Sequence, residues 1–260
     1  MTVPATPASP PVQTNRNNAA VAPTALAVDL GSRTVGVWAA HRGTISGSWD
    51  DESAATGTLV RRGRVVDIDG CASLLTHLVR RYPLPVPDGA VVVACRPVLA
   101  TEADQEATRR VLDAVFAPTR LVFIDTVRAA AVGSGAAAGT LLVVDTGAEL
   151  TEFALLQDGR VRAARRTEIG TQDLTRSATV DLIGDNVLRH IDDLRAGPDA
   201  SAVVTALARG ILLVGDGAVH PGLATAVSGM LRVRVHRAAA PRTAALNGAG
   251  LAAMSLLRHR

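Results

Sequence analysis

One arrangement of residues occurs twice in this chain, and it limits the folds that the chain can adopt. Each copy has an apolar strand ending in Asp-x-Gly, then a second strand, a tight turn and a third strand. The two Asp-x-Gly turns are at 29–31 and 145–147. Helix and strand patterns follow each copy. The sequence therefore contains an internal duplication of a supersecondary unit, which favours a fold with two similar halves.

Apolar periodicity in the rest of the chain predicts alternating helices and strands, and so an α/β fold. Residues 1–24 are rich in Pro, Ala, Thr and Asn without periodicity, and we expect a disordered tail there. Two core subdomains are expected, at 25–139 and 140–260. The final helix of the first subdomain, at about 127–131, is expected to be able to swap to the second subdomain. Further helices are predicted at about 71–81, 102–116, 172–194 with an interruption near Gly184, 199–208, 221–230 and 242–257. Strands are predicted at 26–30, 35–40, 45–49, 65–68, 90–94, 120–124, 141–145, 151–156, 161–166, 211–214 and 232–236. A loop is predicted at 50–58.

The composition favours a cytoplasmic protein that does not bind nucleic acid. All 27 basic residues are arginine, the formal net charge is only +3, and there is no basic run with interleaved aromatic residues. Cys71 and Cys95 lack metal-ligand spacing and are expected to be buried, reduced thiols. No apolar stretch reaches the length of a membrane span, and the N-terminal residues resemble neither a secretory signal nor an amphipathic anchor.

The two turns have the residues that a phosphate site requires. A strand that ends in Asp-x-Gly and turns directly into an antiparallel strand presents backbone amides that bind anions, and glycine lets a ligand approach the backbone closely. The strand-end carboxylate can orient water around a magnesium ion that bridges phosphates. A single turn of this kind is more simply a carboxylate that caps a turn. Two in a repeated context, with a third glycine-flanked strand end at 215–217, favour a nucleotide site.

Five motifs, in order along the chain, resemble those of one superfamily. They are Asp-Leu-Gly-Ser-Arg-Thr at 29–34, Ile-Asp-Thr-Val-Arg-Ala-Ala-Ala at 124–131, Val-Val-Asp-Thr-Gly-Ala-Glu-Leu-Thr-Glu at 143–152, Ile-Leu-Leu-Val-Gly-Asp-Gly-Ala at 211–218 and Asn-Gly-Ala-Gly at 247–250. In this order they resemble the first phosphate loop, connecting helix, second phosphate loop, adenosine motif and closing helix of the actin, sugar-kinase and DnaK-type chaperone ATPases. The chain looks most like the MreB family of bacterial rod-shape actins.

This resemblance implies a duplicated ribonuclease-H-like core with mixed five-stranded sheets flanked by helices. The segments where MreB proteins carry two small outer subdomains are short here, so those subdomains are expected to be missing and polymerisation is in doubt. The resemblance also implies ATP and Mg²⁺ as ligands, with the metal held through water by Asp29 and Asp145. The nucleotide-binding positions that it implies are Gly31, Ser32, Arg33, Thr34, Gly147, Ala148, Glu149, Gly215, Asp216, Gly217 and Ala218.

Several residues depart from the family pattern. Thr126 occupies the position of the glutamate that positions the attacking water, and Asp125 beside it is a weak substitute. Glu149 replaces a glycine in the second phosphate loop, where its charge repels phosphate, and Asp216 replaces the central glycine of the adenosine motif. Arg33 is expected either to contact phosphate or to pair with Glu149 in an empty site. Asp216 is expected either to hydrogen-bond the nucleoside or to block its pocket.

Three hypotheses follow for the function. The first is an actin-like, ATP-binding protein of bacterial cell shape or envelope organisation, with protein partners and weak or absent hydrolysis. The second is a degenerate scaffold that keeps the fold and uses its surface for protein interaction. The third, a chaperone-like or sugar-kinase-like enzyme, has the least support, because no substrate domain follows the nucleotide core.

Overall fold

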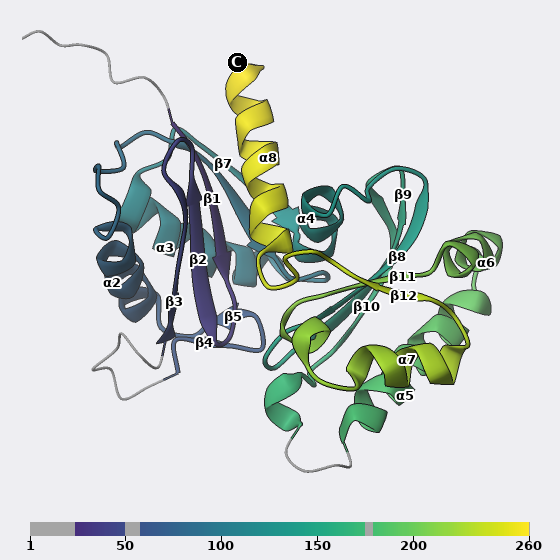
Figure 1. The fold of residues 1–260 in the computed structure, drawn as a ribbon. Helices are drawn as coiled ribbons and strands as arrows, with labels where there is room; N and C mark the ends of the chain where they lie inside the picture. The colour runs from purple at the N-terminus through teal and green to yellow at the C-terminus, as the bar shows by residue number, and fades with distance from the viewer. Residues whose placement is uncertain (1–23, 50–57, 175–178, 260) are drawn as a thin grey trace, which may run out of the picture.

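The computed structural model describes residues 24–49, 58–174 and 179–259, and it forms two α/β halves side by side (Figure 1). Each half contains a five-stranded mixed sheet, with strand orders β3-β2-β1-β6-β7 and β10-β9-β8-β11-β12. In each sheet the first two pairings are antiparallel and the last two are parallel. The predicted duplication of mixed five-stranded sheets is therefore confirmed.

In the first sheet the Asp-x-Gly turn joins the first two strands along the chain. Its strands are β1 (Ala25–Leu30), β2 (Thr34–Ala39), β3 (Gly43–Ser48), β6 (Val91–Arg96) and β7 (Arg120–Asp125). Helices α2 (Ile68–Val79) and α3 (Glu102–Phe116) cover its outer face, where Leu75 and Leu112 are fully buried against the strands. Thr101 and Asp104 form a capping box at the start of α3, so this helix begins at the predicted residue.

The second sheet repeats this plan with different helices. Its strands are β8 (Thr140–Thr146), β9 (Thr151–Gln157), β10 (Arg160–Thr167), β11 (Ile211–Val214) and β12 (Val235–Arg237). Helices α5 (Thr179–Arg195), α6 (Ala200–Arg209) and α7 (Leu223–Leu231) pack with the sheet around Phe153 and Leu155. A short 3-10 helix, η1 (Thr171–Asp173), precedes α5, and another, η2 (Asp216–Val219), follows β11.

Two helices, α4 (Thr126–Gly133) and α8 (Ala244–Arg258), join the halves (Figure 1). They lie in one apolar cluster that includes residues of both sheets, and α8 packs on β1, β2 and β6. A Cβ added at Gly133 would collide with the Ala244 carbonyl, and one at Gly248 with the Ala129 carbonyl. Only glycine permits this close contact of the two helix backbones. The boundary between the two subdomains at 139/140 stays a prediction. Helix α8 follows this boundary in the sequence but packs on the first sheet.

Some predicted boundaries of helices and strands are wrong. The strand predicted at 65–68 is instead a hairpin of β4 (Val60–Arg61) and β5 (Arg64–Val65), because Asp67 caps α2 and starts that helix at Ile68. Helix α5 continues through Gly184, which lies close against Met230 rather than ending the helix. The strand predicted at 232–236 begins later, at Val235.

The structure has short connections at the two places where the outer subdomains are expected to be missing. The described residues between β3 and α2 include the small β4–β5 hairpin, and α6 alone lies between α5 and β11. The predicted tail, save for residue 24, and nearly all of the predicted loop at 50–58 lie outside the described residues. Among the helices that the structure describes, none combines the length and apolar character needed to cross a bilayer.

Candidate functional site

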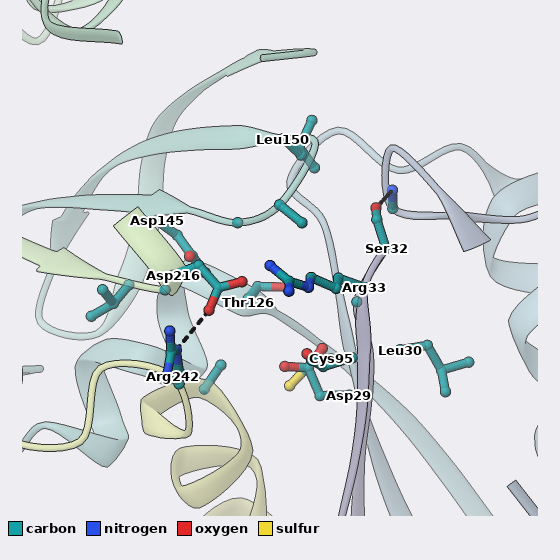
Figure 2. Close-up of a pocket in the computed structure, with 18 of the residues that line it drawn as sticks. Asp29, Leu30, Ser32, Arg33, Cys95, Thr126, Asp145, Leu150, Asp216 and Arg242 are labelled. Atoms are coloured by element: carbon teal, nitrogen blue, oxygen red, sulfur yellow. Dashed lines mark hydrogen bonds and ion pairs between the residues drawn. The ribbon is translucent and has the colours of Figure 1, made fainter. Parts of the chain in front are cut away.

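A cavity of about 550 Å³ lies between the two halves, and all three glycine-flanked turns line it (Figure 2). The first turn contributes 29–34, the second 147–150 together with Asp145, and the third Gly215 and Asp216. Of the predicted site residues, the structure thus brings together Asp29, Gly31, Ser32, Arg33, Thr34, Thr126, Asp145, Gly147, Ala148, Glu149, Gly215 and Asp216.

The first turn is fixed by backbone hydrogen bonds and by a tryptophan. The Gly31 amide donates to the Thr34 carbonyl at 2.9 Å, which closes the turn. The Gly31 carbonyl accepts from the indole Nε1 of Trp49 at 2.6 Å. Because the C=O and N–H of a trans peptide point in opposite directions, the Ser32 amide points away from this indole. The turn therefore offers a backbone donor at the cavity wall.

The second turn is built in the same way, with a different clamp. The Gly147 amide donates to the Leu150 carbonyl at 2.8 Å, while the carbonyls of Gly147 and Ala148 accept from the amides of Thr171 and Gln172 at 2.9 and 2.8 Å. The amides of Ala148 and Glu149 consequently point away from 171–172, a segment that does not line the cavity. Two such N–H groups side by side form an anion-binding concavity.

Three carboxyl groups line the cavity between the turns: Asp145 and Glu152 are buried, and Asp29 is half-buried. Burial raises the pKa of Asp29 to about 6. Burial, and then the negative charges of Asp29 and Asp216, raise the pKa of Asp145 to about 7. Burial and the charge of Asp145 raise the pKa of Glu152 well above its usual value, although Glu152 accepts a hydrogen bond from the Val98 amide at 2.5 Å. Each negative charge disfavours ionisation of the neighbouring carboxyl groups, so a bound cation would stabilise the site.

Glu152 was not among the predicted site residues, although a sequence signal for it exists. It is the cross-strand partner of Asp145 in the β8–β9 pair, and both side chains line the cavity. Counting outward from the turn at 147–150, which joins β8 to β9, places Thr146 opposite Thr151 and Asp145 opposite Glu152. Cys95 also lines the cavity, and burial together with the nearby carboxylates raises its thiol pKa well above the ordinary value.

A magnesium ion fits this donor set through water. Within 24–49, 58–174 and 179–259, no three His, Cys, Asp or Glu side chains are close enough to bind an ion directly. Asp29 and Asp145 offer hard carboxylate oxygens, and Mg²⁺ usually keeps several waters while using one or two carboxylates. A dication would also reduce the repulsion that raises the pKa of Asp145.

The third turn packs directly against the second. A Cβ at Gly215, which has φ +80, would collide with the Asp145 carboxylate, and one at Gly217 would collide with Thr146. Asp216 lines the cavity and accepts from Arg242 Nε at 2.8 Å. Gly217 and Ala218 are buried and do not line the cavity, and their predicted part in nucleotide binding stays a prediction.

The start of α4 places Thr126, and not Asp125, at the cavity. The Thr126 hydroxyl donates to the Arg96 carbonyl at 2.9 Å. Asp125 accepts from Arg96 Nε at 2.9 Å and does not line the cavity, so its predicted substitution for the missing glutamate is not supported by its position.

The predicted alternative of an Arg33–Glu149 pair does not form in the described part of the chain. Glu149 instead accepts from the Arg62 backbone amide at 2.7 Å. Arg33 extends from the first turn across the cavity toward Asp216 (Figure 2). Its guanidinium is thereby available to a ligand between the turns.

Comparisons with solved structures match this architecture. The crystal structure of MreB 5 of Spiroplasma citri bound to AMPPNP superposes with a TM-score of 0.78 at 13% identity, covering 91% of this chain and 98% of that chain. MreB5 of Spiroplasma citri bound to ADP gives 0.74 at 14% identity over the same shares. The ethanolamine utilization protein EutJ from Carboxydothermus hydrogenoformans gives 0.60 at 17% identity, covering 88% of this chain and 89% of that chain. Neither a protein-family model nor a curated protein sequence matches this chain.

The duplicated sheets, the facing turns and these similarities together define an actin-like ATPase fold. The predicted fold is therefore confirmed. Two of these structural neighbours were crystallised with adenine nucleotides, AMPPNP and ADP.

Proposed function

We propose that this protein binds an adenine nucleotide with Mg²⁺ in the cleft between its two halves. The observation that carries the proposal is the pairing of two Asp-x-Gly turns from different sheets across one cavity. Each turn is held by backbone hydrogen bonds and offers amides to an anion. Two turns that face each other bind a phosphate chain from both sides.

Different residues along the cleft bind different parts of the nucleotide and its metal ion. The amides of Ser32, Ala148 and Glu149 donate to phosphate oxygens, while Asp29 and Asp145 hold the water shell of the metal. Bound Mg²⁺ supplies positive charge that neutralises the phosphates. The third turn, with Asp216 and Arg242, forms the nucleoside end of the cavity.

Hydrolysis is proposed to be weak or absent, because the residue at the start of α4 is a threonine. A general base must have a pKa near the working pH and lie within hydrogen-bond reach of the water. The Thr126 hydroxyl does not meet the first condition and is already engaged with the Arg96 carbonyl. Asp125 is held by Arg96 away from the cavity.

The biological role that we propose is in bacterial cell shape or envelope organisation, in the cytoplasm and through protein partners. Its support is the ordered set of motifs that resemble rod-shape actins, together with the likeness of the fold to MreB5. Only small elements replace the outer subdomains, so we expect no filament that pellets with ATP.

A second candidate, a scaffold that binds no nucleotide, is favoured by one observation. The two acidic departures both have partners within the protein, Glu149 at the Arg62 amide and Asp216 at Arg242. Because Glu149 and Asp216 already have hydrogen-bond partners, these two carboxylates need no ligand to satisfy them.

Calorimetry separates the two candidates. We expect ADP to bind with Mg²⁺ and to bind more weakly without it, and Asp145→Asn to weaken the Mg²⁺ dependence. Asp192→Asn, on the exposed face of α5, is the matched control and is expected to bind like the wild type. If neither ADP nor AMPPNP binds at millimolar concentration, the nucleotide proposal is wrong and the scaffold is favoured.

A further inference from the structure

The β4–β5 hairpin of the first half reaches the phosphate turns of both halves. The Arg62 amide donates to Oε2 of Glu149 at 2.7 Å, and the Gly63 amide donates to the Ser32 hydroxyl at 3.1 Å. Arg62 and Gly63 form the turn of the hairpin, and Gly63 lines the cavity. One hairpin turn is thus bonded to a side chain from each phosphate turn, and it forms the wall at this end of the cleft.

Packing also fixes the turn in this position. Gly63 has φ +72, and an added Cβ would lie 2.6 Å from Cγ of Pro97 and 3.3 Å from Leu150 in the second phosphate turn. Glu168, which follows β10, binds Arg62 at 2.7 Å and Arg64 at 3.3 Å. These ion pairs join the hairpin to the second half, although they are too exposed to contribute much energy.

The hairpin determines the surroundings of Glu149. The Arg62 guanidinium is directed to Glu168, and only the Arg62 backbone amide reaches the Glu149 carboxylate. No ion pair to Glu149 occurs among the described residues, and the partner of its carboxylate is a neutral backbone amide. The hairpin therefore holds an acidic group at the phosphate end of the cavity.

The direction of a bound nucleotide follows from the proposed function, on which this inference rests. With the nucleoside of the proposed complex at Asp216 and Arg242, its phosphate chain would extend along the turns that carry Ser32 and Glu149, which line the same cavity. Each additional phosphate adds negative charge and brings it closer to Glu149 and to the hairpin. Charge repulsion over a few ångströms is substantial in a partly buried site.

We infer that Glu149, held in place by the β4–β5 hairpin, makes this cleft select nucleoside diphosphates over triphosphates. A diphosphate uses the amides of both turns and leaves the Arg62–Glu149 bond intact. A triphosphate has to displace the hairpin or accept a carboxylate beside its terminal phosphate. Glu149 is thus a specificity residue.

The test is calorimetry of the full chain with ADP and with AMPPNP, both in excess Mg²⁺. We expect the wild type to bind ADP about 10-fold more tightly than AMPPNP, a difference of about 1.4 kcal/mol. Glu149→Gln keeps an acceptor for the Arg62 amide and removes the charge, so it should reduce the preference to less than about 3-fold, mainly by tightening AMPPNP binding. Glu149→Ala is a second variant, and thermal melting checks that each variant is folded.

Glu106→Gln, an exposed change on α3, is the matched control and should keep the wild-type preference. Equal binding of ADP and AMPPNP by the wild type would overturn the inference and leave the proposed function standing. A diphosphate preference that survives in both Glu149 variants would remove Glu149 as its cause. If no nucleotide binds to the wild type or to any variant, both the proposed function and this inference fail.

Discussion

The two Asp-x-Gly turns share a backbone and differ in their side chains. In both, the glycine amide bonds to the carbonyl three residues later, at 2.9 Å for Gly31 and 2.8 Å for Gly147. In both, carbonyls of the turn accept hydrogen bonds from flanking groups, and the adjacent amides remain available to an anion. Opposite Asp29 in the hairpin register is Gly36, whereas opposite Asp145 is Glu152. The two turns thus have the same backbone hydrogen bond, and the second carries more acidic side chains than the first.

This difference in charge affects what each half can bind. The first turn offers Ser32 and Arg33, both suited to phosphate oxygens. The second turn places Glu149 beside the cavity and Asp145 between two further acids, Glu152 and Asp216. In the proposed complex the phosphates would therefore be attracted mainly by the first turn, and we expect the second half to depend more strongly on a metal ion.

The largest predicted effect concerns the contact that holds the halves together. Gly248→Ala forces a Cβ into the Ala129 carbonyl of α4, so we expect a loss of about 3–5 kcal/mol in the free energy of unfolding. Gly229→Ala, on the exposed side of α7 where an added Cβ meets nothing, is the control and should stabilise by about 0.5–1 kcal/mol. Urea denaturation measures both, and equal effects would contradict the close packing of α4 on α8.

The pH dependence of stability should differ between the turns. The folded protein binds the Asp145 proton more tightly than the unfolded chain does, because the pKa rises from 3.8 to about 7. Without Mg²⁺, stability should therefore fall as the pH rises through this range, by about 2–4 kcal/mol. Asp145→Asn should remove most of this loss, and Asp29→Asn should remove less, since the Asp29 pKa is about 6.

Urea titrations at pH 4, 6 and 8 test this prediction, with Asp192→Asn as an exposed control that keeps the wild-type profile. A stability that rises across the same range in the wild type would show that the buried acids are compensated by groups other than a metal ion.

Restoring a carboxylate between the turns should raise hydrolysis. Thr126→Glu supplies the acid that the start of α4 lacks, and we expect ATP turnover to rise by about 10²-fold, equal to about 2.7 kcal/mol. Thr126→Gln, which has the same shape without a base, is the control and should stay at the wild-type rate. Phosphate release at saturating Mg²⁺ and ATP measures the change, and equal rates in both variants would place the defect elsewhere in the cleft.

The smallest predicted effect is on the ion pairs that join the hairpin to the second half. Glu168→Gln removes the partner of Arg62 and Arg64, whose side chains are 43% and 50% exposed. Because exposed pairs contribute little, we expect a change of less than about 1 kcal/mol in the free energy of unfolding and none in nucleotide preference. A change in the ADP to AMPPNP ratio would mean that these pairs, as well as Glu149, set the specificity.

Much of the fold could be predicted from the sequence because its causes are local. The capping box at Thr101 fixed the start of α3, and apolar alternation with a strand-end aspartate and glycine fixed both turns. The short β4–β5 hairpin was missed, because two-residue strands carry almost no periodicity. Gly184 was a misleading signal, since packing against Met230 outweighs the weak helix propensity of glycine.

The sequence by itself determined the duplicated sheets and the two Asp-x-Gly turns, because hydrogen bonding within a turn and apolar periodicity depend on near neighbours. Only the tertiary structure decided the partners of the side chains. The Asp125 carboxylate pairs with Arg96, and the Glu149 carboxylate accepts from the Arg62 amide. Such choices depend on which groups far apart in the chain the fold brings within hydrogen-bond distance, and no local pattern records that.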